Sequence, residues 1–310
     1  MIAFFANIFG YLLNFIYNLV ENYGLAIIIF SILVKLAMVP ISIKQQKTMK
    51  KSTRIQAKMK ELQEKYKNNP EKLNQETLEL YKNENMSPFS GCLSAIVQII
   101  LLFAVFYLVR SPLTYMKKVD ADVINKYTKI VKQNDLSSKS AYPEIEIVRE
   151  IDNIRALKNN EVQITEDADE DKISLTEIKD EELDEMNLNM EFFGLNLAQI
   201  PTNSSDWKAY IIPILYVIVS VLSMKITTAT QKTKLETIEN NDEKALTKKE
   251  EEFDPMAQMN KNMNMMFPVM YLAVALIAPL GLALYWLMNS LLMIVERLAL
   301  NKLLKDEEEN

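Results

Sequence analysis

Long stretches without a charged side chain constrain this sequence more than any other feature. Met265–Val295 runs for 31 residues without Asp, Glu, Lys or Arg, and Cys92–Val109 runs for 18. An apolar helix of about 20 residues crosses the hydrocarbon core of a bilayer, which is about 30 Å thick. Tyr23–Ile43 has one charge in 21 residues, and Trp207–Thr227 has an apolar centre. These blocks predict an all-α polytopic membrane protein.

The longest block is too long for one comfortable span, because 31 residues in one helix would extend roughly 46 Å. Pro279 and Gly281 supply a natural break inside it. We therefore predict two spans in this block, joined by a tight turn, and five spans in all. The predicted spans are residues 23–43, 90–110, 207–227, 262–278 and 280–300.

Charge in the connecting segments predicts the orientation. The segment 44–86 has 11 Lys and Arg in 43 residues, which places it in the cytoplasm. Parity then puts the loop 228–261 and the tail 301–310 in the cytoplasm as well. The N-terminus and the acidic region 111–206, which has 21 acidic and 11 basic residues, lie outside. We predict a multi-pass protein of the bacterial cell membrane with its C-terminus inside.

Two of these connecting segments carry further expectations. Residues 44–86 read as a helical hairpin, because apolar positions recur at spacings of three and four on both sides of an Asn-Asn-Pro-Glu turn at 68–71. We expect this hairpin to be a mobile cytoplasmic arm that meets other proteins. Glu166–Glu185 is strongly acidic, and we expect it to be a flexible or weakly helical insertion that is dispensable.

Residues 1–22 allow two interpretations. Asn7, Asn14, Asn18 and Glu21 fall on one narrow helical stripe, and apolar side chains cover the rest. This pattern is typical of an amphipathic helix lying at the outer membrane surface. Because the polar stripe is thin, a sixth span is the alternative.

Composition excludes most enzyme classes. The chain has no His, one Cys and 5 Gly, so it lacks a histidine base, a thiolate cluster for metals and the glycine-rich loops that cradle phosphates. The net charge of −6 argues against a general nucleic-acid binder. We expect a protein that is not an enzyme and that uses no cofactor or metal.

Lys35 is the sharpest functional candidate. It lies near the middle of the first predicted span, where a basic residue costs roughly 2.5–3.5 kcal/mol on insertion scales. We count no acidic residue in the interior of any span, so Lys35 should face water inside the membrane or receive a charge from a visiting molecule. The alternative is that Lys35 snorkels toward the cytoplasm and only anchors its helix.

Other polar residues of the spans could line one hydrophilic groove with Lys35. Ser31 lies four residues before Lys35 on the same helical face. The remaining members of the predicted substrate groove are Gln98, Tyr285, Trp286 and Asn289. Each of them could instead simply bond to a neighbouring helix.

The spans together resemble the YidC/Oxa/Alb family of membrane protein insertases. The resemblance is carried by NYGLAIIIFSILVKLAMVPISIKQ, by SPFSGCLSAIVQ and by FPVMYLAVALIAPLGLALYWLMN, in this order and with a charged hairpin after the first. It implies insertion of nascent or short client proteins into the bilayer, alone or beside the Sec translocon, with the ribosome as a further partner. It also places the family's groove arginine at Lys35, its second-span glutamine at Gln98 and its final-span tryptophan at Trp286.

The departures from the family pattern also matter. Lys35 keeps the positive charge but lacks the bidentate fork of arginine, and the tail 306–309 is acidic where many bacterial members end in basic residues. The short outer region is similar to the Gram-positive branch. A small transporter or channel subunit is the alternative function, although we find no inverted repeat or broken helix pair.

Overall fold

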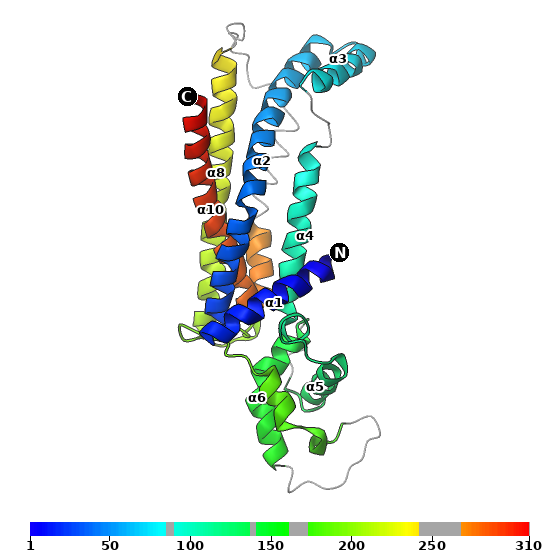
Figure 1. Cartoon of the computed structure of the whole chain (residues 1–310), viewed down its shortest axis with the longest axis vertical. Coiled ribbons are helices and arrows are strands. Elements are labelled where there is room, and N and C mark those ends of the chain that lie inside the picture. Colours follow the sequence, from blue (N-terminus) through cyan, green and yellow to red (C-terminus); the bar gives the residue numbers. More distant parts are fainter. Residues whose placement is uncertain (85–89, 137–140, 161–172, 242–267, 310) are drawn as a thin grey trace. The chain divides into compact units, whose positions relative to one another are not determined.

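The structure is a computed structural model that describes residues 1–84, 90–136, 141–160, 173–241 and 268–309. Helices dominate these residues (Figure 1), and one short antiparallel hairpin is the β-structure among them. The elements are α1 (Ile2–Val20), α2 (Tyr23–Lys65), α3 (Pro70–Asn83), α4 (Ser90–Arg110), the π-helical turn η1 (Leu113–Lys117), α5 (Ala121–Gln133), α6 (Pro143–Asn160), η3 (Leu175–Glu177), α7 (Asp180–Met186), β1 (Glu191–Phe192), β2 (Leu195–Asn196), η4 (Pro201–Asn203), η5 (Trp207–Tyr210), α8 (Ile211–Asn241) and α10 (Leu280–Glu309).

The chain divides into two compact units. The first unit comprises Met1–Leu33, Leu101–Ser220 and Phe267–Ser290. The second unit comprises Val34–Ile100, Val221–Met266 and Leu291–Asn310.

Four helices of the described residues are long and apolar enough to cross a membrane. They are Ile2–Val20, Tyr23–Thr48, Trp207–Ile226 and Leu280–Lys302. Two shorter apolar helices, Ile99–Arg110 and Pro268–Ile277, overlap the other predicted spans, and residues 262–267 lie outside the described part of the chain. The fold is therefore that of an all-α polytopic membrane protein, and the number of five spans stays a prediction.

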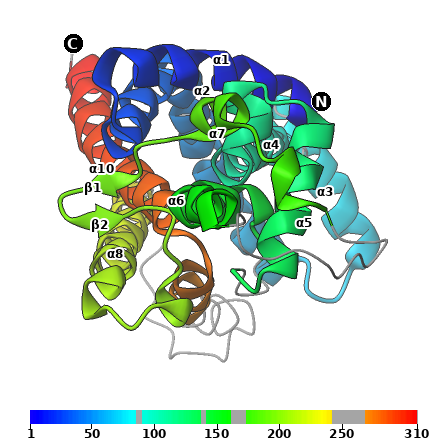
Figure 2. The same cartoon turned by 90° about the horizontal axis from the view of Figure 1, so that it is seen from below.

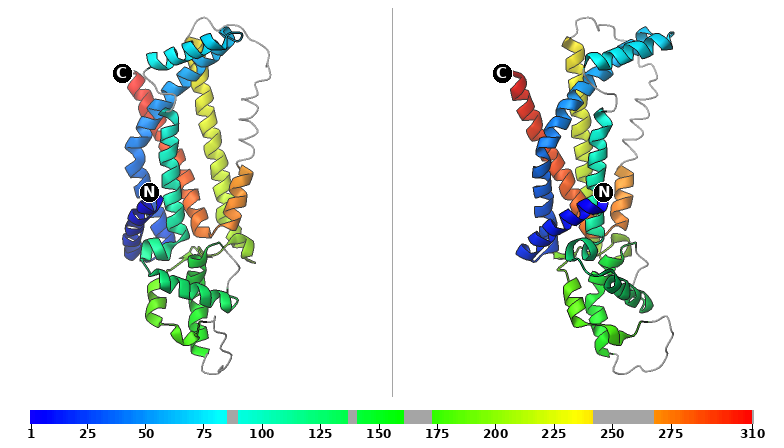
Figure 3. Two further views of the ribbon diagram at one scale, coloured as in Figure 1. Left: turned by 90° about the vertical axis from the view of Figure 1, so that its right-hand side faces the viewer. Right: turned by 45° about the vertical axis from the view of Figure 1, so that its right-hand side comes forward.

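The first predicted span and the first arm of the hairpin form one continuous helix. α2 runs for 43 residues through Pro40 and ends at Lys65. α3 begins at Pro70, and the side chain of Asn69 caps it by accepting a hydrogen bond from the Lys72 N–H. Figure 3 shows α3 folding back beside the end of α2. Proline in the first helical turn and asparagine before it are the usual start of a helix.

The acidic region contains a packed helical core. α5 presents Ile124, Tyr127, Ile130 and Val131 to α6, which buries Ile145, Ile147, Val148, Ile151 and Ile154. Buried Leu183 and Met186 of α7 extend this core. Charged side chains cover its outside, so the acidic composition reflects a solvated surface around an apolar centre.

The expectation that Glu166–Glu185 is a flexible insertion is wrong for its second half. Residues 173–186 fold into η3 and α7, and Leu183 is fully buried. Three ion pairs attach this stretch to the neighbouring helices: Lys126–Glu182, Arg155–Asp184 at 2.6 Å and Lys158–Asp180 at 2.6 Å. Residues 166–172 lie outside the described part of the chain.

α1 packs on η1 through a small residue. A Cβ atom at Gly10 would lie 1.8 Å from the carbonyl oxygen of Tyr115, so only glycine allows this approach. The opposite face of α1 exposes large apolar side chains at Phe4, Ile8, Tyr11, Phe15 and Leu19. An apolar exposed face is compatible with both interpretations of residues 1–22, a helix at the membrane surface or a sixth span.

Candidate functional site

A partly buried ion pair connects α2 and α10 within the second unit. Lys35 Nζ lies 2.6 Å from Glu296 Oε2, and the two side chains expose 18% and 12% of their surfaces. The other carboxylate oxygen, Glu296 Oε1, is buried and has no hydrogen-bond partner among the described residues. The pair therefore leaves one strong acceptor unused in a place that is nearly closed to water.

The expectation that Lys35 has no acidic partner is wrong. Glu296 directly follows the long uncharged stretch and lies inside the apolar helix Leu280–Lys302. Glu296 lies four residues before the end of the predicted span 280–300, so it was not counted as an interior residue. Glu296 can be identified in the sequence by one pattern. Where an apolar span continues beyond its first charged residue, that residue should pair with a charge on another span.

A second polar contact joins the same two helices. Gln46 Nε2 donates a hydrogen bond to Asn301 Oδ1 at 2.8 Å. Gln46 Oε1 is buried and has no partner among the described residues. Each of the two contacts between α2 and α10 thus leaves a buried oxygen that could accept a hydrogen bond from another molecule. Gln46 lies within the predicted hairpin 44–86, where a hydrated side chain is expected, so its sequence position gave no sign of this contact.

The other predicted groove residues have different surroundings. Ser31 is buried and donates to the Ile27 carbonyl oxygen at 2.7 Å, so its hydroxyl is already satisfied within α2. Tyr285 is buried and Asn289 is half-buried, both in α10. α4 includes Gln98, but its side chain lies outside what the structure describes.

Trp286 belongs to an aromatic cluster in the first unit. Its ring centroid lies 5.8 Å from that of Tyr216 in α8, and Tyr216 lies 6.0 Å from Tyr271. One turn further along both helices, the buried hydroxyls of Ser220 and Ser290 are 3.3 Å apart. The spacing of Tyr216 and Ser220, four residues apart on one helical face, is the sequence signal for this contact.

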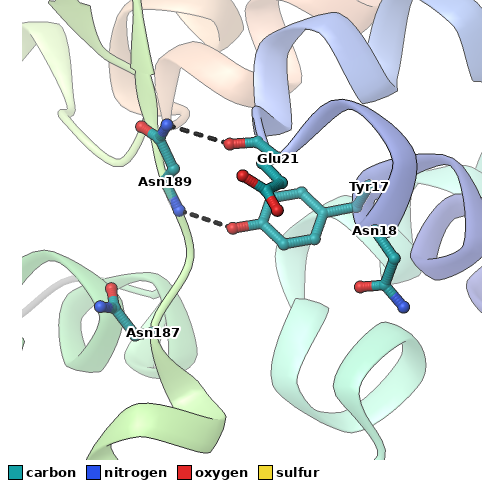
Figure 4. A pocket seen from close by; sticks show the side chains of 5 residues that line it. All are labelled: Tyr17, Asn18, Glu21, Asn187 and Asn189. Atoms are coloured by element: carbon teal, nitrogen blue, oxygen red, sulfur yellow. Dashed lines mark hydrogen bonds between the residues drawn. The ribbon is translucent and has the colours of Figure 1, made fainter.

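A polar cavity of about 460 Å³ lies at the junction between α1 and the segment before β1 (Figure 4). Its lining residues are Tyr17, Asn18, Glu21, Asn187 and Asn189. Asn189 donates two hydrogen bonds across it, from its backbone N–H to Tyr17 Oη at 2.9 Å and from Nδ2 to the Glu21 carbonyl oxygen at 3.0 Å. These bonds anchor the end of α1, and the cavity belongs to the other unit from Lys35.

Long apolar helices with a partly buried ion pair between two of them define a polytopic α-helical membrane protein. No cluster of three or more His, Cys, Asp or Glu able to hold a metal ion occurs among the described residues. Comparison with known proteins identifies the family. The chain belongs to the family described as 60Kd inner membrane protein, which matches residues 15–308.

Several relatives share about a third of this chain. The membrane protein insertase YidC of Chlorobaculum tepidum is 50% identical over 98 residues, which are 32% of this chain and 17% of that protein. The protein of the same name from Pelodictyon phaeoclathratiforme is 51% identical over 92 residues, or 30% and 16%. That of Caldanaerobacter subterraneus subsp. tengcongensis is 41% identical over 102 residues, or 33% and 50%. The match therefore spans half or less of each relative.

Proposed function

We propose that this protein is a membrane protein insertase that moves the hydrophilic part of nascent or short client proteins into and across the bilayer. The observation that carries the proposal is the Lys35–Glu296 pair, which is partly buried between two helices that are long and apolar enough to span a membrane. The family membership and the name of the relatives support the same function. Clients are nascent membrane proteins, with the ribosome and the Sec translocon as further partners.

The Lys35–Glu296 pair carries a free-energy cost. Removing two ions from water costs several kcal/mol each, and their mutual attraction often does no more than offset that penalty. A well-packed apolar pair would stabilise the helices at least as well. The unused acceptors, Glu296 Oε1 and Gln46 Oε1, add to this cost. Such an arrangement indicates a functional polar path rather than a stabilising contact.

The proposed mechanism is an exchange of partners at Lys35. An acidic residue in the translocated tail of a client takes the place of Glu296, while backbone N–H groups of the client donate to the unused oxygens. At 4 Å and an effective dielectric constant of 20, an ion pair is worth about 4 kcal/mol before desolvation. Because one carboxylate replaces another, the net change is much smaller than this value. The tail is therefore held briefly and released when its apolar segment enters lipid.

The orientation and the remaining site residues complete the proposal. The N-terminus lies outside, and the α2–α3 hairpin and the C-terminus lie in the cytoplasm, since the basic residues of 44–86 carry the charge asymmetry. Gln98, Tyr285, Trp286 and Asn289 contact the passing client, and Ser31 supports the turn of α2 that precedes Lys35.

Reconstituted insertion of two clients that differ only in an acidic or a neutral tail tests this mechanism. Lys35→Arg should insert both clients, because it keeps the charge, whereas Lys35→Glu should fail with the acidic tail. Lys35→Ala is ambiguous alone, because it leaves Glu296 buried without a partner, which costs about 3–5 kcal/mol of stability.

The double variant Lys35→Ala with Glu296→Ala is the matched control, since it removes both charges together. It should regain thermal stability but still lose the preference for acidic tails. Insertion of acidic-tailed clients by Lys35→Glu at the wild-type rate would show that Lys35 only anchors its helix.

A further inference from the structure

The turn between β1 and β2 has an unusual residue in a strained position. Phe193 and Gly194 form a two-residue turn, with φ angles of 49° and 74°. Turns with two positive φ angles favour Asn-Gly or Gly-Gly, because a Cβ atom crowds the backbone in this conformation. Phenylalanine in the first position is therefore locally unfavourable, and its presence requires a compensating interaction.

The protein itself supplies little of that compensation. Phe193 is 90% exposed, more than any other large apolar side chain among the described residues. Its one ring contact there is an edge-on contact with Phe192 at 4.7 Å. Phe192 points the other way and packs on Gly24, where its ring occupies the space that a Cβ atom would need. Phe192 is thus packed against α2, whereas Phe193 is exposed.

Backbone hydrogen bonds fix the level of this hairpin along the membrane normal. The Asn189 carbonyl oxygen accepts from the Tyr23 N–H, in the first turn of α2. The carbonyl oxygens of Leu197 and Gln199 accept from the N–H groups of Gly281 and Leu280, in the first turn of α10. The hairpin therefore lies at the end of two apolar helices, where the hydrocarbon core meets the headgroups.

Exposed apolar side chains at the starts of the spans favour lipid as the partner of the Phe193 ring. Trp207, which is 71% exposed, begins η5 at the entrance to α8, and Leu25 of α2 and Ile214 of α8 are also exposed. Phe193 is thus one of several exposed apolar side chains at the ends where these helices begin, and its neighbour Phe192 ties it to the first turn of α2. Figure 2 shows the β1–β2 turn pointing away from α6. Aromatic rings at this depth are the usual interfacial anchors of membrane proteins.

We propose that Phe193 inserts into the adjacent lipid leaflet and anchors the β1–β2 hairpin to the membrane. The strain of the turn is tolerated because it directs the ring into lipid. The hairpin in turn holds the first turns of α2 and α10, so the anchor stabilises the start of both helices.

A spin label at position 193 tests the depth directly. In a Cys92→Ser background, Phe193→Cys is labelled with a nitroxide, whose ring is apolar, and reconstituted into vesicles of phosphatidylcholine and phosphatidylglycerol. Collision with oxygen should exceed collision with a water-soluble nickel complex, as at Leu222→Cys in α8. Asp152→Cys on the exposed face of α6 is the aqueous control. A label that resembles Asp152→Cys, or that neither reagent reaches, would overturn the proposal.

A second variant tests the anchor by whether hydrogen-exchange protection rises or falls. Asn accepts positive φ better than Phe. If the turn faces water, Phe193→Asn should therefore relieve its strain and raise the hydrogen-exchange protection of residues 189–199. If the ring is anchored in lipid, the same change should lower this protection in vesicles, by about threefold or more. Unchanged or increased protection would contradict the anchor.

Discussion

At the scale of single residues, the relation between Lys35 and Glu296 governs what the site can bind. Glu296 holds the ammonium group at 2.6 Å, so in the proposed mechanism a client carboxylate competes with an internal one that is already in place. We therefore propose that Glu296 sets how strongly an acidic tail is held, a role that is separate from the charge of Lys35 itself.

Removing the internal competitor should lengthen the stay of acidic clients. Glu296→Gln keeps the size of the side chain but frees Lys35 for the client. We expect photocrosslinks from position 286 to acidic-tailed clients to increase, by up to tenfold if the competitor contributes about 1.4 kcal/mol. Clients with neutral tails serve as the control and should be unaffected. Equal crosslinking of acidic tails in both proteins would mean that Glu296 does not compete.

At the scale of elements, the contact between α1 and η1 depends on one missing side chain. Gly10→Ala would place a methyl group 1.8 Å from the Tyr115 carbonyl oxygen, so α1 must shift away. We expect a loss of about 1–3 kcal/mol, the usual cost of overpacking. The measurement is the thermal unfolding temperature of the purified protein.

Gly281→Ala in α10 is the matched control for this change. A Cβ atom there would meet its nearest neighbour, Tyr23 Cε1, at 3.5 Å, an ordinary contact. Alanine also favours helix by up to about 1 kcal/mol, so this variant should be as stable as the wild type or slightly more so. A similar loss in both variants would show that the close approach at Gly10 is not the cause.

The start of α6 should become more stable on mild acidification. Burial raises the pKa of Glu144, although hydrogen bonds from the N–H and hydroxyl of Thr114, at 3.0 and 2.7 Å, work in the opposite direction. A raised pKa means that the folded protein holds the proton more tightly than the unfolded chain, so the stability is fully present below the ordinary pKa of 4.5 and declines as the pH rises through the folded value.

We expect the hydrogen-exchange protection of residues 143–160, corrected for intrinsic rates, to rise as the pH falls from neutral toward about 5. Glu144→Gln should flatten this dependence, since the amide does not titrate. Glu182 does not interfere in this range: burial raises its pKa, but hydrogen bonds from Lys126 and Tyr127 bring it below the ordinary value. A profile that is unchanged in Glu144→Gln would assign the effect to another group.

Three of the predicted spans, residues 23–43, 207–227 and 280–300, correspond to apolar helices long enough to cross a membrane, whereas the packing of α5, α6 and α7 was not predicted, for a physical reason. Lipid requires an uninterrupted apolar stretch, which a single sequence displays directly, and Asn69 and Pro70 mark a helix start by local chemistry alone. The core of α6 needs only one apolar face, so buried Ile147 and Ile151 are interspersed with charges that dominate the composition. Lys35 and Glu296 are brought together by folding across most of the chain, and no local pattern encodes that contact.

At the scale of the whole molecule, the hairpin of α2 and α3 carries little buried surface among its described side chains. α3 has no buried residue, and Lys58–Glu84 at 2.7 Å is an exposed ion pair of small energetic value. Tyr66 contributes cation–π contacts with Lys65 and Lys72 at the turn, at 5.3 and 5.4 Å. Few buried contacts are typical of segments that open easily.

Deleting Lys51–Lys82 should leave membrane integration intact and reduce insertion of clients. The spans do not need these residues for their length, whereas we propose that clients meet the hairpin first. Carbonate extraction measures integration, and the reconstituted assay measures insertion. A variant in which a Gly-Ser linker of equal length replaces the same residues separates loss of contacts from loss of reach. Full activity of the deletion would mean that clients bypass the hairpin.

The bonds from Asn189, Leu197 and Gln199 to the first turns of α2 and α10 have a mechanical consequence. The N–H groups at the start of a helix need acceptors, and here one short segment supplies them to both helices at once. Sliding α2 along its axis would break its one bond, and sliding α10 would break its two, whereas a tilt about the first turns strains these bonds less. We therefore expect any separation of α2 from α10 to occur by rotation about their first turns.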